Sequence, residues 1–239
     1  METPTRAERA LAAVRSLPVF RALDPEAQRR IAALATIKDL QRGDHLWREG
    51  DDPDSLTIIV KGRVKVVRET DAGDVIFEIF GEGEPVGAIA VYNFMPYPAA
   101  AVALEPVSLL MLPRRDYFEL LDRNPQFARG IIRELTRMVL ALTRKLEEMR
   151  GHSVESRIAQ LFLTLADRMG RETREGLEVS IQLSRQEIAD LVGTTVESAI
   201  RVMSRWNRDG VLITGEKRFV VPARDRLRAL AEGRSEGEG

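Results

Sequence analysis

The chain has no cysteine and only two histidines among its 239 residues. The first absence excludes disulfides, thiolate nucleophiles and cysteine-ligated iron–sulfur clusters. No apolar run approaches the roughly 20 residues that a transmembrane helix needs, and the N-terminal stretch METPTRAERALAAVRS lacks the hydrophobic centre of a signal peptide. We therefore expect a cytoplasmic protein with no membrane partner.

Residues that assemble catalytic sites are also scarce. The sequence contains no cluster of metal ligands and no glycine-rich loop for phosphate. With so few histidines and no thiol, no recognisable set of nucleophile, base and oxyanion donors can be put together. We therefore expect a protein that is not an enzyme.

The net charge of −1 is unevenly distributed along the chain. Residues 1–127 carry 16 Lys and Arg against 20 Asp and Glu, whereas residues 128–239 carry 20 against 17. A basic C-terminal half beside an acidic N-terminal half is typical of a two-part chain, although solvated charged faces also produce such differences.

Short apolar runs separated by turn residues fill residues 36–113. Before them, residues 8–34 are predicted to form short helices, with Pro18 interrupting them and Asp24 as an N-cap. The apolar runs have the length and composition of β-strands, and DAGD at 71–74 is a candidate hairpin turn. Roughly eight such strands indicate a sandwich or a β-roll. The clearest runs are SLTIIV, RVKVV, VIFEIF and SLLML.

A long helix is predicted from Asn124-Pro125 to about residue 150. Its apolar residues follow a heptad spacing that is typical of a two-stranded dimer interface, while the alternative is packing against the sheet of its own domain. The expected interface residues are Ile132, Leu135, Val139, Leu142, Leu146 and Met149. Ser153 can cap the next helix, so residues 150–153 mark the expected domain boundary.

The stretch LSRQEIADLVGTTVESAIRVMSRW, residues 183–206, has the pattern of two helices joined by a sharp turn. Ser184 and Glu187 form a capping box for the first helix, and Gly193 can adopt the positive φ that the turn needs. The second helix, capped by Thr195, would bury one face. That face consists of Ala199, Val202, Met203 and Trp206. The spacing predicts a helix-turn-helix.

Three elements are expected around this motif. A polar loop is expected at GRETREGLE before it, and a last helix is expected to begin at Pro222. Between the motif and that helix, LITGEKRFVV at 212–221 predicts a small hairpin around Gly215. The hairpin would make the motif a winged helix-turn-helix.

The outer face of the second helix carries the residues expected to read bases, which are Val196, Glu197, Ile200 and Arg201. An arginine can donate two hydrogen bonds to guanine O6 and N7, and a glutamate can accept one from cytosine N4. Outside this motif, Glu197 and Arg201 would be an ordinary i,i+4 surface pair. Phosphate contacts, which set register without reading sequence, are expected from Arg185, Thr195, Ser198, Lys217 and Arg218.

These parts, in this order, resemble the CRP/FNR superfamily of bacterial transcription regulators. The motif SRQEIADLVGTTVESAIRVMSRW carries the resemblance, including the family's Glu-x-x-x-Arg pair at Glu197 and Arg201. The resemblance implies an α+β fold with a cyclic-nucleotide-binding-like β-roll, a long dimerisation helix and a C-terminal winged helix-turn-helix. The expected domains are the roll in 1–123, the dimerisation helix in 124–150, the DNA-binding domain in 151–232 and a disordered tail in 233–239.

The sequence departs from the family pattern in the recognition helix. Val196 stands where the CRP branch has an arginine, so the helix is more similar to the FNR branch. Ile200 replaces the serine of that branch.

A second departure concerns the nucleotide cassette of the roll. In the family, a Glu of this cassette binds the ribose and an Arg neutralises the cyclic phosphate, and both charges are missing here. The matching positions are Gly87, Ala88, Ile89, Pro98, Ala99 and Ala100. Because a buried phosphate without a cationic partner is costly, we expect no cyclic AMP binding through this cassette.

The resemblance leaves the cofactor unknown. The iron–sulfur cluster of the FNR type is excluded by the missing cysteines. Some relatives hold a haem, for which His45 and His152 are the two available imidazoles. The alternative for each is an ordinary surface or hinge histidine.

The resemblance and the residues together predict a homodimeric, sequence-specific DNA-binding transcription regulator. It would bind a pseudo-palindromic duplex, with RNA polymerase as a further partner, and its roll would sense a signal other than cyclic AMP. The alternative is a non-DNA regulatory subunit with a cyclic-nucleotide-binding-like roll that docks on a partner protein. The exposed positions predicted for Glu197 and Arg201 argue against this alternative.

Overall fold

The computed structural model describes residues 5–21, 23–68, 70, 75–148, 153–215 and 217–233. Two compact units make up the chain, residues 1–141 and residues 142–239. In the described part of the chain, no helix is both long and apolar enough to cross a membrane.

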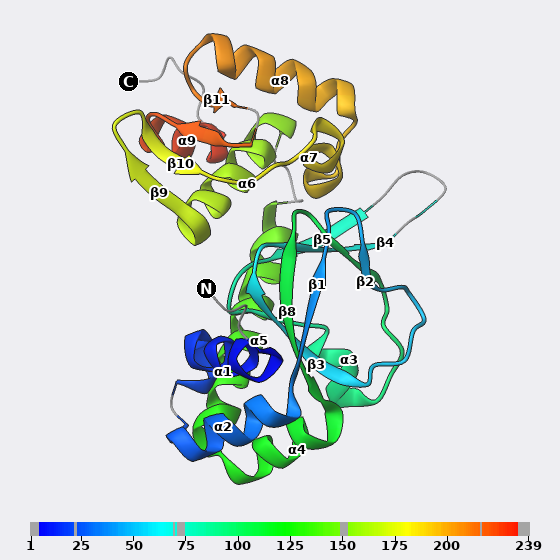
Figure 1. The fold of residues 1–239 in the computed structure, drawn as a ribbon. Coiled ribbons are helices and arrows are strands. Elements are labelled where there is room, and N and C mark those ends of the chain that lie inside the picture. The colour runs from blue at the N-terminus through cyan, green and yellow to red at the C-terminus, as the bar shows by residue number, and fades with distance from the viewer. Residues whose placement is uncertain are drawn as a thin grey trace. The chain divides into compact units, whose positions relative to one another are not determined.

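The first unit is built on two antiparallel sheets of four strands each, counted over the described residues (Figure 1). One sheet has the order β1-β8-β3-β6 and the other β2-β7-β4-β5. The strands are β1 (Thr36–Leu40), β2 (His45–Trp47), β3 (Ser55–Lys61), β4 (Val64–Arg68), β5 (Val75–Phe80), β6 (Pro85–Val86), β7 (Ala100–Ala103) and β8 (Val107–Pro113). The predicted roll over residues 36–113 is confirmed. The DAGD turn lies outside the described residues, although β4 and β5 on either side of it do pair antiparallel.

Strands β3 and β8 are buried on both faces. Side chains alternate between the two faces of a strand. Ile58 and Leu110 enter a core that helices cover, whereas Ile59 and Leu109 enter a second core lined by strands of both sheets. Burial on both sides explains why SLTIIV and SLLML are continuous apolar runs rather than alternating ones.

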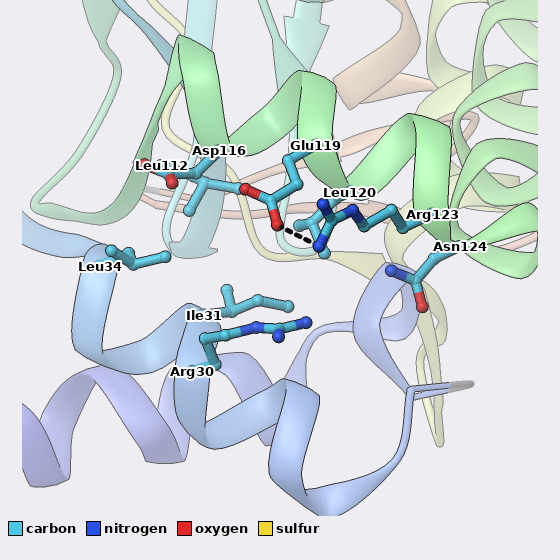
Figure 2. A pocket seen from close by; sticks show the side chains of 9 residues that line it. All are labelled: Arg30, Ile31, Leu34, Leu112, Asp116, Glu119, Leu120, Arg123 and Asn124. Carbon is cyan, nitrogen blue, oxygen red and sulfur yellow. Dashed lines mark ion pairs between the residues drawn. The ribbon is translucent and has the colours of Figure 1, made fainter.

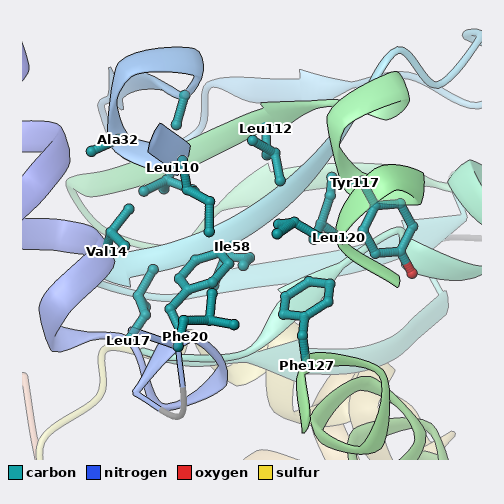
Figure 3. Close-up of a cluster of buried hydrophobic side chains, with 14 of the residues drawn as sticks. Val14, Leu17, Phe20, Ala32, Ile58, Leu110, Leu112, Tyr117, Leu120 and Phe127 are labelled. Carbon is teal, nitrogen blue, oxygen red and sulfur yellow. The ribbon is translucent and has the colours of Figure 1, made fainter. Parts of the chain in front are cut away.

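Helices close the outer side of the first core, as Figure 3 shows. They are α1 (Arg6–Ser16), the short 3-10 helix η1 (Pro18–Phe20), α2 (Pro25–Leu34), α3 (Ala88–Asn93), α4 (Arg114–Arg123) and α5 (Pro125–Glu148). The Phe20 and Phe127 rings stack there with centroids 5.6 Å apart. The predicted cap Asp24 accepts hydrogen bonds from the first turn of α2. Helices α3 and α4 had no counterpart among the elements predicted from the sequence.

Helix α5 carries two apolar stripes rather than one. Phe127 and Ile131 are buried, and Leu135, predicted to lie in a dimer interface, is half-buried against the same core. Ile132 and Val139 are each 60% exposed. One stripe therefore packs on its own domain, as the alternative considered from the sequence predicts, while the dimer interface stays a prediction for the exposed stripe. The side chains of Leu142 and Leu146, and the whole of Met149, lie outside the described residues.

The second unit places helices around a four-stranded antiparallel sheet of order β11-β12-β10-β9. Its elements are α6 (Val154–Met169), β9 (Gly170–Thr173), β10 (Gly176–Val179), α7 (Arg185–Val192), α8 (Val196–Arg208), β11 (Ile213–Thr214), β12 (Phe219–Val221) and α9 (Arg224–Ala231). Ser153 caps α6 as predicted, since its hydroxyl accepts from the Ser156 amide at 3.1 Å. The last helix begins at Arg224, two residues after the predicted start at Pro222. Of the predicted tail, only Gly233 is among the described residues.

The stretch GRETREGLE is a hairpin, so the prediction of a polar loop was wrong. Strands β9 and β10 pair in register from Gly170 opposite Val179 to Thr173 opposite Gly176. The hairpin was missed because β9 is an edge strand whose charged residues face water, and charged edges are how sheets avoid further pairing. Gly176 was the available signal. Its φ is +124°, and a Cβ there would lie 2.4 Å from the carbonyl oxygen of Val221.

Candidate nucleic-acid interface

The first helix of the predicted motif begins with a complete capping box. The Ser184 hydroxyl accepts from the Glu187 amide at 3.1 Å, and the Glu187 carboxylate accepts from the Ser184 amide at 2.9 Å. The prediction from Ser-x-x-Glu is confirmed. Ile188 and Ala189 are fully buried, while Val192 is half-buried.

The turn between the two helices depends on Gly193, as predicted. Its φ is +66°, and a Cβ there would meet no atom within 4 Å, so the backbone conformation and not crowding selects glycine. Arg157 of α6 donates to the carbonyl oxygens of Val192 and Gly193 at 2.9 and 3.2 Å. These bonds satisfy carbonyls that the end of α7 leaves without helical partners. Sequence reasoning missed Arg157, because the partners are 35 residues or more apart.

Helix α8 buries the face that its spacing predicts. Thr195 caps it by accepting from the Ser198 amide at 3.3 Å. The predicted inner residues are all buried, with exposed fractions of 0% for Ala199, 8% for Val202, 0% for Met203 and 1% for Trp206. The opposite side of the helix is therefore free for a partner.

The four candidate base readers lie on that opposite side. Glu197 and Arg201 are exposed, Ile200 is 44% exposed and Val196 is half-buried. The Arg201 guanidinium contacts the Ser198 hydroxyl at 3.4 Å. Over the described residues, no ion pair joins Glu197 to Arg201. The ordinary surface pair considered from the sequence is thus not formed, and both charged ends face solvent.

The residues predicted to contact phosphate differ in their burial and in their bonding partners. Arg185 is half-buried, its guanidinium lies 3.2 Å from the Met203 sulfur, and burial lowers its pKa. The Thr195 and Ser198 hydroxyls take part in the cap of α8. Lys217 is exposed in the connection of the hairpin.

Arg218, which lies between β11 and β12, is held by two carboxylates of the β9–β10 hairpin. Its guanidinium lies 2.7 Å from Glu178 and 3.5 Å from Glu175. The hydrogen bond that Arg218 donates to Glu178 raises the pKa of Arg218, and the same bond lowers the pKa of the Glu178 carboxyl. The β11–β12 hairpin is closed by a 2.8 Å bond from the Gly215 amide to the Arg218 carbonyl, which confirms the predicted wing.

In the first unit, the positions of the family's nucleotide cassette surround helix α3. Gly87 precedes this helix with a φ of +71°, followed by buried Ala88 and by Ile89, which is 56% exposed. Pro98 is exposed, and the two alanines after it, Ala99 and Ala100, are buried. None of these six residues carries a charge. Arg68, at the end of β4, brings a guanidinium to these cassette positions. It donates to the Pro98 carbonyl at 3.0 Å and lies 3.7 Å from the Glu49 carboxylate.

An aromatic pair occupies the space beside Gly87. The rings of Trp47 and Tyr97 stack with centroids 4.0 Å apart and planes inclined by 10°. The Trp47 indole N–H donates to the Ala99 carbonyl at 3.1 Å. A Cβ on Gly87 would lie 2.6 Å from Tyr97 and 2.9 Å from Trp47. Burial, with two nearby carboxylates, raises the pKa of Tyr97 to about 12, so its hydroxyl stays neutral at physiological pH.

The structure describes one of the two candidate haem ligands. His45 is half-buried in β2, opposite Val102, and His152 lies outside the described residues. Within the described ranges, no group of three metal-ligating side chains comes together. A hollow of about 40 Å³ between α2 and α4, lined by the residues in Figure 2 and bordered by the Glu119–Arg123 ion pair, has room for about one water molecule.

Both halves of the chain match known protein families. Residues 37–124 match the family model of the cyclic nucleotide-binding domain, and residues 156–230 match that of the Crp-like helix-turn-helix domain. The chain is 27% identical over 217 residues to the cyclic AMP receptor protein of Thermus thermophilus, covering 90% of this chain and 97% of that protein. It is 26% identical over 200 residues to the transcriptional activator protein Anr of Pseudomonas aeruginosa, covering 84% and 82%.

A solved structure agrees with these sequence matches. FixK2 of Bradyrhizobium japonicum has the same fold, with a TM-score of 0.72 and 20% identity over 82% of this chain and 96% of that one. This likeness shows the fold, and the two domain matches and their order identify the family that the sequence resembled. The chain belongs to the CRP/FNR superfamily of transcription regulators, with a cyclic-nucleotide-binding-type β-roll followed by a helix-turn-helix DNA-binding domain.

Proposed function

We propose that this regulator binds DNA as a homodimer and reads a pseudo-palindromic site through the outer face of α8. The observation that carries the proposal is the contrast between the two faces of this helix. One face is buried, whereas Glu197 and Arg201 on the other are exposed and not paired with each other. Charged side chains held in this way near the N-terminal end of a recognition helix can enter the major groove.

The chemistry of the exposed residues sets the half-site that they would select. Arg201 can donate two hydrogen bonds to guanine O6 and N7, and Glu197 can accept from a cytosine amino group. Val196 and Ile200 can only make apolar contacts with thymine methyl groups. The proposed half-site therefore combines thymines with one essential G·C pair.

Phosphate contacts would orient the protein on this half-site without reading it. Lys217 is the best placed of the candidates, because it is exposed on the wing. Arg218 would first have to exchange its carboxylate partners for a phosphate. Arg185, Thr195 and Ser198 lie around the start of α7 and α8, where backbone amides and the helix dipole also favour an anion.

Arg201→Ala should weaken binding to the preferred site by about 1–3 kcal/mol per half-site and relax selectivity at one base pair. The reason is the loss of the bidentate contact to guanine. Arg201→Lys keeps the positive charge but not the planar fork, so it should lose the same selectivity with less loss of affinity. Selection from random duplexes followed by titration measures both quantities.

Arg208→Ala is the matched control, since Arg208 is exposed near the opposite end of α8. It should change affinity for all sequences alike and leave the guanine preference intact. If Arg201→Ala returned the same consensus with the same guanine preference, α8 would not read DNA as proposed. Failure of the wild-type protein to prefer any duplex would instead favour a regulatory subunit that docks on another protein.

The uncovered stripe of α5 supports the homodimer. Ile132 and Val139 are seven residues apart and each 60% exposed, and Leu140 beside them is 54% exposed. A spacing of seven places apolar residues on one seam of a two-stranded coiled coil. Two copies paired through this seam would present two α8 helices to half-sites about 34 Å apart.

Val139→Glu should convert the dimer to a monomer, because it would place a charge between two apolar helices. Analytical ultracentrifugation measures the mass of the species in solution. Leu34→Glu is the control, because Leu34 is also exposed, at 43%, but lies on α2. If Val139→Glu kept the dimer mass and the native fold, the 132–140 stripe would not be the interface.

We further propose that the roll responds to a signal other than cyclic AMP. Ala88 and Pro98 stand where the resemblance places the two charged nucleotide contacts. The Trp47–Tyr97 stack fills the side of the cassette beside Gly87. The guanidinium that reaches this segment, Arg68, already donates to the Pro98 carbonyl and lies 3.7 Å from Glu49. A cyclic phosphate would lose its water and gain a cation only by displacing these partners.

Millimolar cyclic AMP should leave both the melting temperature and the DNA affinity unchanged. A ligand that binds only the folded state raises stability by about 2.7 kcal/mol at one hundred times its dissociation constant, which a thermal melt detects readily. The cyclic AMP receptor protein of Thermus thermophilus can serve as the positive control in the same assay. A clear shift for this chain would mean that the nucleotide binds by another route.

A further inference from the structure

The carboxylate of Glu155, in the first turn of α6, contacts two residues in the last turn of α8. It accepts a hydrogen bond from the Trp206 indole N–H at 2.8 Å, and it forms an ion pair with the Arg205 guanidinium. The side chains of Glu155 and Arg205 are 30% and 47% exposed, whereas Trp206 is 1% exposed. One acidic residue therefore fastens the C-terminal end of the recognition helix to α6.

The hydrogen bond from Trp206 contributes most to the stability of this contact. A buried indole N–H is a donor that needs an acceptor, and leaving it unpaired destabilises the folded state. The exposed ion pair with Arg205 adds less, because water screens it. Glu155 thus combines a structural hydrogen bond with a surface charge pair on the same helix.

This contact engages the Arg205 side chain. Arg205 lies four residues after Arg201, on the outer part of α8, where a phosphate contact would be a natural assignment. Its guanidinium is instead bound to Glu155. Arg157, two residues after Glu155, holds the turn at the other end of α8 through the carbonyls of Val192 and Gly193. The C-terminal end of the recognition helix and the turn that precedes this helix are therefore both bound to the first turns of α6.

We infer that Glu155 is a positioning residue for DNA recognition. It touches no base and sets the orientation of α8 through Trp206 and Arg205, and Arg205 serves this contact rather than a DNA phosphate. This inference rests on the proposed function, since it assigns how the reading face of α8 is held. It also makes the start of α6 a place where a small movement would alter DNA affinity.

The test uses the full-length protein and the duplex that it selects. Glu155→Ala should weaken binding about tenfold, the effect of roughly one charged hydrogen bond, without changing the base preference. Glu155→Gln keeps an acceptor oxygen for Trp206 and should recover most of the loss. Asp167→Asn is the matched control, because Asp167 pairs with Arg224 near the far end of α6 and touches no part of α8 in the described structure. It should leave the affinity unchanged.

Salt dependence separates positioning from direct phosphate binding by Arg205. Each lost phosphate contact lowers the slope of log affinity against log salt by about 0.9. Arg205→Gln should leave that slope unchanged, and its effect should not add to that of Glu155→Ala, because both remove the same pair. A lower slope for Arg205→Gln, with an unchanged affinity for Glu155→Ala, would overturn the inference.

Tryptophan fluorescence tests the contact independently of DNA. Glu155→Ala should change the emission of Trp206, while Trp47, in the other compact unit, contributes equally to both proteins. An unchanged emission would overturn the contact even if the proposed function stood. If the wild-type protein bound no preferred duplex, the proposed function would fail and the positioning role with it, whereas the fluorescence would still report on the Glu155–Trp206 bond.

Discussion

The burial of one face of α8 is the constraint on which the DNA-binding unit depends. Trp206 is the largest of the fully buried side chains in the described structure, and Ala199, Val202 and Met203 are buried on the same face. Because an α-helix repeats every 3.6 residues, burying this stripe forces Glu197 and Arg201 to face outward. The face that we propose reads DNA is therefore fixed by packing. Glu155 then holds the C-terminal end of α8, and Arg157 holds the turn before this helix.

Close packing leaves one face of α8 exposed, whereas in the roll it fills part of the cassette with side chains. Two-sided burial of β3 and β8 builds two cores back to back, and the second core includes Trp47 and Tyr97. These aromatic rings lie against Gly87, at the position where the family's cassette begins. The roll thus keeps the architecture of its family, while side chains of the chain itself occupy one side of the cassette. Under the function proposed above, a signal that acts on this roll is recognised by chemistry other than a charged nucleotide cassette.

The features that could be predicted from the sequence are those with a local physical cause. The caps at Asp24, Ser153, Ser184 and Thr195 each depend on a side chain that bonds a backbone amide two or three residues away. The buried face of α8 follows from its period alone. The sharp turn at Gly193 follows from the positive φ that glycine adopts without strain.

What the sequence did not indicate depends on contacts between distant residues. The hydrogen bonds from Trp206 to Glu155 and from Arg157 to Val192 join residues 51 and 35 positions apart. The β9–β10 hairpin was hidden because its charged residues suit an exposed edge as well as a loop. Leu135 fits the heptad spacing, yet it is half-buried against its own domain, because a helix packed on one side can carry two apolar stripes.

The central claim is that two α8 helices of a homodimer read bases in successive major grooves. Dimethyl sulfate methylates guanine N7, which faces the major groove, so its protection on a selected duplex tests that claim directly. The account predicts two protected guanines, one in each half-site and separated by about one helical turn of 10–10.5 base pairs. A bound duplex with a single protected guanine, or with none, would contradict it.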